Sequence, residues 1–486
     1  MDSEKTPQFK VLIAGGSIAG LTLANALARA NVDFIVLESH GRIDASIGGA
    51  LTIVSNGQRI LDQMGIYDDI NPHLEPAGDV YTYLKDGRLL GEMDTPAVMR
   101  ERHYYPVAWL PREQLLRILY ESIPNKSKVL VNKKVKTVDH SEDGVVVHCE
   151  DGSEYAGSMI AGADGVHSTI RGEMWRHMEQ SKKGKSKAKK DRKAITAEYA
   201  CILGISRPTE GLKPGEIHRT WGKNFTTFVN VGKENQVFWF IFTKMDRKYQ
   251  YLGIPKFSKE DLDAKAKSFL DTHLCPGVKF ESVYENATSS SFVPLQEGVC
   301  KWWSWGRFAC LGDAVHKTTP NIGQGAALAI EDAASLANHI VKLAQKDSDI
   351  TSADISRSLA HWGTSLRPRV KTVCDGGAMF TRLEALANWP LKLVALYLSP
   401  HLGGIFADIV SITHLGAPTL DFLPLPEREE TGSVTDSSEI DEKAIDEATG
   451  EKATDEKVTA RKKVKKPELK LRSYVRAFWA VNLSLK

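Results

Sequence analysis

An aspartate that follows a buried apolar run is the first feature of the sequence that needs a chemical partner. Asp313 lies in residues 309–316, ACLGDAVH, where an apolar stretch ends in a glycine. An ionised carboxylate at such a place loses more hydration free energy than the surrounding apolar contacts return. The sequence therefore predicts that a polar or charged group lies beside Asp313.

A glycine-rich turn near the N-terminus has the spacing of a dinucleotide-binding site. Residues 15–20, GGSIAG, lie between a strand pattern and a helical pattern, and they place Gly15, Ser17 and Gly20 at the three glycine positions. Such a turn lets the backbone and the helix N-terminus approach a pyrophosphate. Glu38 ends the next strand pattern, where an acidic residue binds the adenosine ribose. A tight turn that binds no ligand is the alternative.

Two further motifs resemble those of a known enzyme family. Residues 162–171, GADGVHSTIR, resemble the Asp-Gly motif of the flavoprotein monooxygenases that bind FAD in a single dinucleotide-binding domain. Residues 311–337, LGDAVHKTTPNIGQGAALAIEDAASLA, resemble the Gly-Asp motif of the same enzymes. Three motifs in the family's order are a specific signal, and the resemblance covers most of residues 8–380. It implies that the cofactor is FAD.

The resemblance assigns FAD contacts to several residues. It implies that Asp313 binds the ribityl chain and that Asp164, in the second motif, also lies at the cofactor. It further implies that Gly325 and Ala326 begin a helix whose N-terminus faces the flavin ring. The dipole of such a helix stabilises negative charge on the ring.

Four more residues match family positions around FAD. Arg112 matches the arginine that reaches the phosphates or the ribityl chain, and a residue that caps its own helix is the alternative. Gly48 and Gly49 match a glycine-rich turn that passes the flavin. Val135 is expected to touch the adenine side through its backbone.

The likeness is greatest to the fungal FAD-dependent monooxygenases that epoxidise prenyl chains of indole diterpenes and meroterpenoids. It implies that NADH or NADPH reduces the flavin, and that O₂ then epoxidises or hydroxylates a small hydrophobic prenylated or terpenoid substrate in secondary metabolism. This chemistry needs no protein nucleophile and no metal, so the catalytic residues stay unknown. His316 and Lys317 are expected to lack an acid–base function. A prenyl-chain reductase and a non-catalytic prenyl-binding carrier are the alternatives.

The block from 199 to 300 is expected to form the wall of the substrate site. Its β-type stretches include residues 237–242, VFWFIF, in which Trp239 is predicted to be a core residue, because a strand buries alternate side chains. No residue from 199 to 245 matches the arginine and tyrosine that activate phenols in aromatic hydroxylases of this fold. The sequence therefore disfavours a phenol substrate.

The order of strand and helix patterns around these residues predicts an α/β protein. We expect a Rossmann-like FAD-binding domain with an inserted mixed β-sheet substrate domain and C-terminal helices. The expected segments are the first βαβ part (1–80), a substrate-domain segment (81–110), the second FAD-binding part (111–180), a basic loop (181–198), the β-sheet substrate domain (199–300), the Gly-Asp part (301–345), a helical region (346–426), a disordered charged linker (427–466) and an amphipathic tail (467–486).

Composition excludes several classes of protein. The formal net charge of +2 does not indicate nucleic-acid binding, and the basic run at 181–193 lacks the aromatic residues that stack on bases. The six cysteines show no C-x-x-C pair, which argues against a metal site or a disulfide framework. The N-terminal residues lack a secretory signal pattern, so we expect a cytoplasmic protein. The oligomeric state is not determined by the sequence.

Two C-terminal stretches have features that favour association with a membrane surface. The expected membrane is that of the endoplasmic reticulum. Residues 389–416 are apolar, but the run of about 20 residues that a spanning helix needs is interrupted by Lys392, Pro400, His401 and Asp408. We therefore expect helices that face a membrane or cover the substrate. The tail at 467–486 combines apolar residues at helical spacing with basic ones, a pattern that suits a lipid interface. A frayed tail is the alternative.

Overall fold

A six-stranded sheet carries the N-terminal glycine turn at the end of its first strand. Its order is β20-β21-β12-β1-β2-β8, and its strands are parallel except at the β20 edge. Leu12 and Ile13 in β1 are fully buried, as is typical of a parallel strand covered on both faces. The strands are β1 (Lys10–Ala14), β2 (Asp33–Leu37), β8 (Val129–Leu130), β12 (Met159–Gly162), β20 (Ser304–Trp305) and β21 (Phe308–Cys310).

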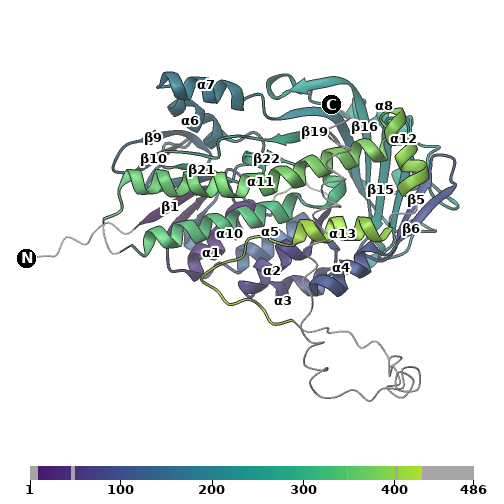
Figure 1. The fold of residues 1–486 in the computed structure, drawn as a ribbon, viewed down its shortest axis with the longest axis horizontal. Helices are drawn as coiled ribbons and strands as arrows, with labels where there is room; N and C mark the ends of the chain where they lie inside the picture. The colour runs from purple at the N-terminus through teal and green to yellow at the C-terminus, as the bar shows by residue number, and fades with distance from the viewer. Residues whose placement is uncertain (1–8, 45–49, 347–348, 400–402, 429–486) are drawn as a thin grey trace, which may run out of the picture. The chain divides into compact units, whose positions relative to one another are not determined.

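The computed structural model describes residues 9–44, 50–346, 349–399 and 403–428 (Figure 1). Contacts group Met1–Glu427 into one unit. Within it, α1 (Ile18–Arg29) joins β1 to β2 and completes the expected βαβ unit. Two long helices, α10 (Gly325–Ala344) and α11 (Ser352–Glu384), run side by side, and α10 packs on α1.

Shorter helices surround these elements. The α-helices are α2 (Ser55–Gln63), α3 (Tyr67–Ile70), α4 (Thr95–His103), α5 (Arg112–Glu121), α6 (Thr169–Met178), α7 (Lys182–Asp191), α8 (Lys259–Lys267) and α9 (Phe280–Glu285). The 3₁₀ helices are η1 (Asn71–His73), η2 (Lys126–Lys128), η3 (Lys233–Asn235), η4 (Tyr251–Gly253), η5 (Gly312–Ala314) and η6 (Pro320–Ile322).

An eight-stranded mixed sheet forms the other half, in the order β22-β19-β13-β16-β15-β14-β5-β6. Neighbouring strands are antiparallel except β14 and β5, which are parallel. The two sheets and their helices confirm the predicted α/β fold with a Rossmann-like part. The strands are β5 (Val80–Leu84), β6 (Leu89–Met93), β13 (Thr196–Ser206), β14 (Ile217–Gly222), β15 (Phe225–Val231), β16 (Val237–Gln250), β19 (Ala287–Val299) and β22 (His316–Lys317).

The two faces of this sheet have different roles because alternate residues of a strand face opposite sides. Trp239 in β16 is fully buried and packs edge-to-face against Phe280 of α9, with ring centroids 5.1 Å apart. This confirms the prediction that Trp239 is a core residue. Its neighbours Phe240 and Phe242 belong to a different hydrophobic cluster and line a cavity on the other face.

Three small sheets complete the fold. The sheet β11-β10-β9 is antiparallel throughout. The members of the three sheets are β9 (Val135–His140), β10 (Val145–Cys149) and β11 (Glu154–Gly157); β3 (Ala50–Ile53), β4 (Glu75–Pro76) and β7 (Ala108–Pro111); and β17 (His273–Cys275) and β18 (Val278–Lys279).

The basic run is a helix, so the prediction of a loop at 181–198 was wrong. Ser181 caps the N-terminus of α7 by accepting from the Gly184 N–H, and Ala188 is fully buried. Asp191, in the last turn, accepts from Trp175 Nε1 and from the Lys301 N–H. One buried carboxylate and one buried methyl group hold the helix to the protein, and Lys187 lies over the rings of Trp302 and Trp305, while the other lysines of the helix face solvent.

The C-terminal helices follow α11. The helix α12 (Trp389–Leu393) runs directly into the π-helical turn η7 (Val394–Leu398), and α13 (Gly403–His414) packs on α4. Within the described ranges, none of the helices has the length and apolar character required to cross a bilayer. The predicted linker and tail, 429–486, lie outside the described residues.

Candidate functional site

The glycine turn borders a cavity of about 510 Å³ between β1, β2 and α5. Gly15 has φ +103°, and a Cβ there would lie 2.6 Å from the Ala163 carbonyl oxygen, so the turn requires glycine at this position. Ser17 caps α1 by accepting from the Gly20 N–H at 3.4 Å, and its hydroxyl donates to Ala163 O at 2.8 Å. A Cβ on Gly20 would lie 2.0 Å from Gly15 O. Gly20 therefore maintains the turn without lining the cavity.

Glu38 lies at the same cavity and stabilises the glycine turn. Its Oε2 accepts from the Gly16 N–H at 2.6 Å, and its Oε1 accepts from the His40 N–H at 2.8 Å. Burial alone would raise the pKa of Glu38, but the hydrogen bonds from His40, Gly16 and Ser39 lower it below its usual value. Glu38 is therefore ionised at neutral pH, and it already accepts hydrogen bonds from two backbone N–H groups.

The rest of this cavity is rich in positive charge. Val135 and Asp164 line it together with four basic side chains, which come from Arg42, Arg112, Lys133 and Lys134. Asp164 Oδ1 accepts from Ser168 Oγ at 2.5 Å, and its Oδ2 accepts from the Ile170 N–H at 3.0 Å. The cavity therefore combines a helix N-terminus with several cations, which is the environment that a diphosphate requires.

A second cavity, of about 570 Å³, adjoins the first. Both are lined by Ser17, Arg112, Ala163 and Gly165, so Arg112 stands between them. Asp313, Lys317, Gly325 and Ala326 line the second cavity on the side of η5 and α10. The opposite wall is the face of the eight-stranded sheet, and it consists of Cys201, Leu203, Phe228, Phe240, Phe242, Val293, Pro294, Leu295 and Gln296.

Asp313 has the charged partner that its sequence position requires. Its carboxylate forms an ion pair with Lys317, four residues later, and its side chain is 39% accessible because it faces the cavity. Burial alone would raise the pKa of Asp313, but Lys317 above all, with His316 and Arg112, lowers it. A negative charge is therefore held at the cavity surface near neutral pH.

A buried ion pair behind Asp313 was not predicted. His316 Nε2 lies 2.6 Å from Asp332 Oδ2, and the same oxygen accepts from the Gly312 N–H at 2.7 Å. Burial would lower the pKa of His316, but the Asp332 carboxylate raises it to about 10. His316 therefore fixes the Asp313 loop to α10, and it is not among the residues that line either cavity.

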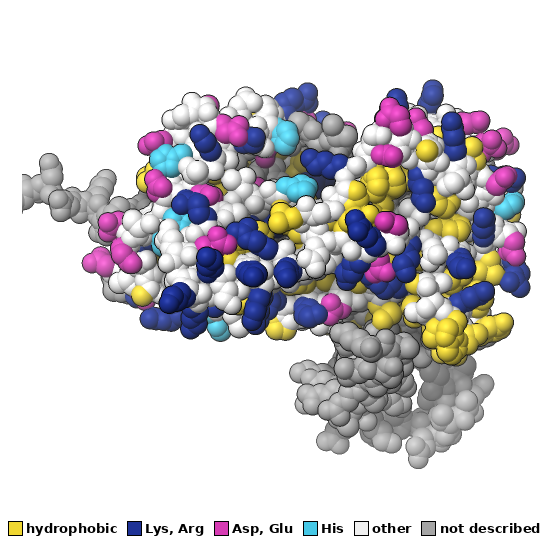
Figure 2. All heavy atoms as spheres, turned by 90° about the horizontal axis from the view of Figure 1, so that it is seen from above, with side chains coloured by type: hydrophobic (Ala, Val, Ile, Leu, Met, Phe, Trp, Pro, Cys, Tyr) yellow, Lys and Arg dark blue, Asp and Glu magenta, His cyan; other side chains and the backbone are white. Residues whose placement is uncertain are grey.

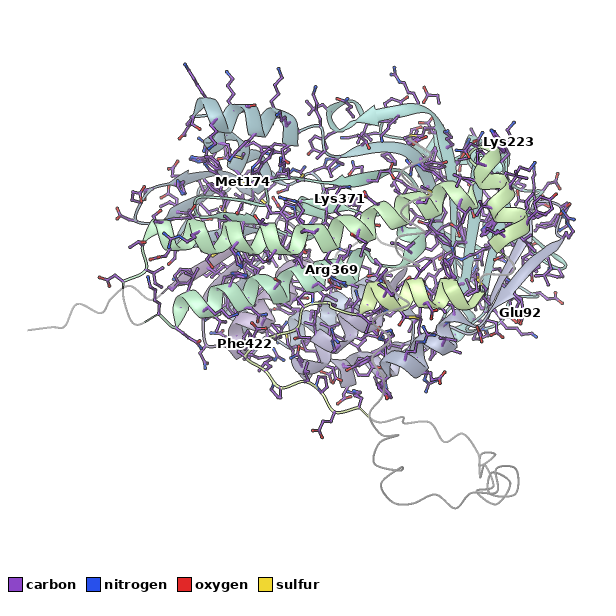
Figure 3. All side chains as sticks on the ribbon, in the orientation of Figure 1. Glu92, Met174, Lys223, Arg369, Lys371 and Phe422 are labelled. Carbon is purple, nitrogen blue, oxygen red and sulfur yellow. The ribbon has the colours of Figure 1, made fainter. Side chains whose placement is uncertain are left out.

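A polar network anchors the N-terminus of α10. Gln324, which precedes Gly325, accepts from Asn56 at 3.0 Å and donates to His414 Nε2 at 2.9 Å. Burial lowers the pKa of His414 to about 3, so the ring is neutral and can accept this bond. Arg369, labelled in Figure 3, projects from α11 and binds Glu331 of α10 at 2.7 Å. The network joins α2, α10, α11 and α13 at the edge of the second cavity.

A second ion pair lies beside the sheet wall, because Arg219 is the cross-strand neighbour of the cavity-lining Phe228 and projects from the same face of the sheet. Arg219 of β14 binds Glu384, and Asn321 of η6 donates to the same carboxylate at 2.8 Å. The Arg219 guanidinium lies 4.6 Å from the centroid of Phe228, which lines the cavity. The sequence gives Arg219 no role, because its partners Asn321 and Glu384 lie 102 and 165 residues away and the local pattern does not identify them.

The residues around the two cavities fit an FAD molecule. A Cβ on Gly165 or on Gly325 would meet nothing within 4 Å, so both glycines leave open space at the cavity surface. The basic first cavity suits the adenosine and diphosphate part, and the second suits an apolar ring system beside a helix N-terminus. Of the twelve residues predicted to bind FAD, Gly48 and Gly49 lie outside the described residues, Gly20 lines neither cavity, and the other nine line one or both.

Comparisons with known proteins agree with this geometry. The family model described as "FAD binding domain" matches residues 8–362. The FAD-dependent monooxygenase spyC of Aspergillus fumigatus is 41% identical over 88% of this chain and 90% of its own length. The FAD-dependent monooxygenase olcE of Penicillium canescens is 35% identical over 88% of this chain and 92% of its own length.

Solved structures share the fold. Klebsiella pneumoniae HpxO complexed with FAD and uric acid superposes with a TM-score of 0.67 at 20% identity, over 86% of this chain and all of that chain. CtdE in complex with FAD and a substrate has a TM-score of 0.63 at 17% identity, over 83% of this chain and 99% of that chain.

Proposed function

The chain belongs to the FAD-binding domain family and is an FAD-dependent monooxygenase, and on that premise we propose a substrate class for it. We propose that it uses NADH or NADPH and O₂ to epoxidise, or else hydroxylate, a prenylated or terpenoid small molecule of secondary metabolism. In the epoxidation, the alkene, O₂, NAD(P)H and a proton give the epoxide, water and NAD(P)⁺.

The proposal rests on the apolar composition of the sheet wall that lines the second cavity. Its residues are aliphatic or aromatic apart from Cys201 and Gln296, and burial raises the pKa of the Cys201 thiol far above its usual value. This part of the described wall has no acidic or basic side chain that could ionise a phenol. An apolar alkene matches such a surface, because transfer from water to the wall is favourable and requires no polar partner.

We propose that the residues at the two cavities hold FAD in an extended form. Glu38 would bind the ribose, Arg112 would neutralise the phosphates, and Val135 would lie at the adenine. Asp164 and Asp313 would bind the chain that leads to the ring. When bound, FAD supplies the redox chemistry by accepting two electrons from NAD(P)H and passing them to O₂. The N–H groups at the start of α10, with Gly325 and Ala326, would favour negative charge on the ring.

In this proposal the sheet wall binds the substrate and not the cofactor. Phe228, Phe240 and Phe242 would hold the apolar part of the substrate and exclude water from the reacting bond. Arg219 would act indirectly, because it packs on Phe228 from the same face of the sheet and is held there by its ion pair with Glu384.

Product analysis under ¹⁸O₂ tests the substrate class. The purified protein, with NADPH or NADH, should convert a candidate prenylated compound into a product with one ¹⁸O atom. Consumption of NAD(P)H with a product that gains hydrogen but no ¹⁸O would indicate a prenyl-chain reductase. A protein that binds the compound without flavin and without turnover would instead be a carrier.

Glu38→Gln should weaken FAD binding about tenfold, or about 1.4 kcal/mol. The amide removes the negative charge, and its NH₂ group would replace an acceptor that now faces the Gly16 or His40 N–H. Equilibrium dialysis of FAD against the apoprotein measures the change, with Glu179→Gln as the control because Glu179 pairs with Arg192 and lines neither cavity. Equal affinities of Glu38→Gln and wild type would mean that another group holds the ribose.

A further inference from the structure

One stretch of the surface exposes large apolar side chains on consecutive helical turns. Trp389 is 75% exposed, Leu393 49%, Tyr397 68% and Leu398 55%. The first three are spaced four residues apart on α12 and η7, so they share one face. Figure 2 shows hydrophobic side chains gathered toward the right-hand side of the molecule, where α12 lies in Figure 1. We name Trp389, Leu393, Tyr397 and Leu398 the α12 face.

The opposite side of the same helical segment is packed against the protein. Ala395 is fully buried, and both α12 and η7 contact α11. Asn388 caps α12 by accepting from the Leu391 N–H at 3.0 Å. The segment is therefore a folded helix held on α11, and the exposure of its outer face is a stable feature of the surface.

The charge around the α12 face indicates the kind of surface that it meets. The 23 residues from 385 to 407 contain no aspartate or glutamate, whereas Lys392 lies within the helix and is exposed. Lys223, which Figure 3 places beside α12, is also exposed, and the next residue, Asn224, donates its N–H to Ala385 O at 2.7 Å. A helical segment that carries apolar and aromatic side chains, a lysine of its own and no acidic residue matches the headgroup region of an anionic bilayer.

We propose that the α12 face docks on an anionic lipid surface, with Trp389 and Tyr397 at the level of the headgroups and Leu393 between them. The helix lies on the bilayer and does not cross it. This inference goes beyond the proposed function and does not depend on it.

Docking would also bring the substrate cavity close to the bilayer. Phe406 of α13 packs against Phe380 of α11, with ring centroids 5.3 Å apart. Arg219 lies over both Phe380 and Phe228, at 5.4 Å and 4.6 Å, and Phe228 lines the second cavity. The helices beside the α12 face are thus linked to the cavity wall through Phe380 and Arg219.

A fluorescent label on the α12 face tests the proposal in the full chain. All six native cysteines are buried, so a cysteine introduced as Tyr397→Cys should react selectively with a nitrobenzoxadiazole maleimide. Vesicles of phosphatidylcholine with phosphatidylserine should raise the emission of this label and shift it to shorter wavelength. Leu393→Cys is a second labelled variant, and Leu252→Cys, at a leucine that is 86% exposed on η4, is the control that should show no shift.

The outcomes separate lipid docking from its competitors. The proposal would be overturned if the protein sediments with vesicles while the labels at 393 and 397 show no shift. Another part of the chain, such as the tail at 467–486, would then bind the lipid. Absence of sedimentation would also overturn it. A shift without lipid that grows with protein concentration would assign the α12 face to contact between copies of the chain. The combined variant Trp389→Ser, Leu393→Ser and Tyr397→Ser should lose about tenfold or more in vesicle partitioning while it retains its flavin.

Discussion

Asp332→Asn is expected to lower the free energy of unfolding by about 3–5 kcal/mol, the usual cost of removing one partner from a buried ion pair. Asp332 is fully buried, and one of its oxygens binds both the His316 ring and the Gly312 N–H. The variant leaves the imidazolium without its counter-charge and loosens the loop that carries Asp313. Urea denaturation measures the loss. Asp421→Asn, which breaks the exposed pair with Lys342, is the control and should change stability by less than about 0.5 kcal/mol.

The pH dependence of stability gives an independent measurement of the same pair. The folded pKa of His316, about 10, lies above its value of about 6.5 in the unfolded chain. The stabilisation that this shift represents is complete below pH 6.5, and it is lost as the pH rises toward 10. The difference in stability between wild type and His316→Gln should therefore shrink across this interval. A difference that stays constant from pH 6.5 to 10 would show that His316 is neutral in the folded protein.

Asp313→Ala is expected to weaken FAD binding about 10- to 150-fold, which corresponds to the roughly 1.5–3 kcal/mol of a hydrogen bond to a charged group. Asp313 is ionised, faces the second cavity, and is held in place by its ion pair with Lys317. Its removal takes away an acceptor for the ligand and leaves Lys317 unpaired at the cavity. The flavin content of the purified protein and the dissociation constant of FAD report the loss.

A matched control is available for this experiment. Lys371 and Asp375 form an ion pair with the same four-residue spacing, on the exposed side of α11 and away from both cavities. Asp375→Ala should therefore retain the flavin of the wild type. Full flavin occupancy in Asp313→Ala as well would remove Asp313 from the cofactor site, whereas loss in both variants would indicate a general effect on folding.

The sequence by itself determined those parts of the molecule whose chemistry depends on near neighbours. The turn at Gly15, Ser17 and Gly20 and the β1-α1-β2 unit follow from short-range sterics and hydrogen bonding, so their pattern was visible in about thirty residues. The need of Asp313 for a partner was visible as well, and Lys317 supplies it from four residues away. The burial of Trp239 followed from the period of a strand.

Only the tertiary structure decided which distant residues meet. Asp332, Glu384 and His414 are ordinary polar residues within helical patterns, and each becomes decisive through a contact that packing creates. The helix α7 was missed for a similar reason, because its lysine-rich sequence has almost no apolar period and is held by Asp191 through Trp175 and Lys301. The free energy of a buried charge depends on the groups folded around it, and local sequence does not contain that information.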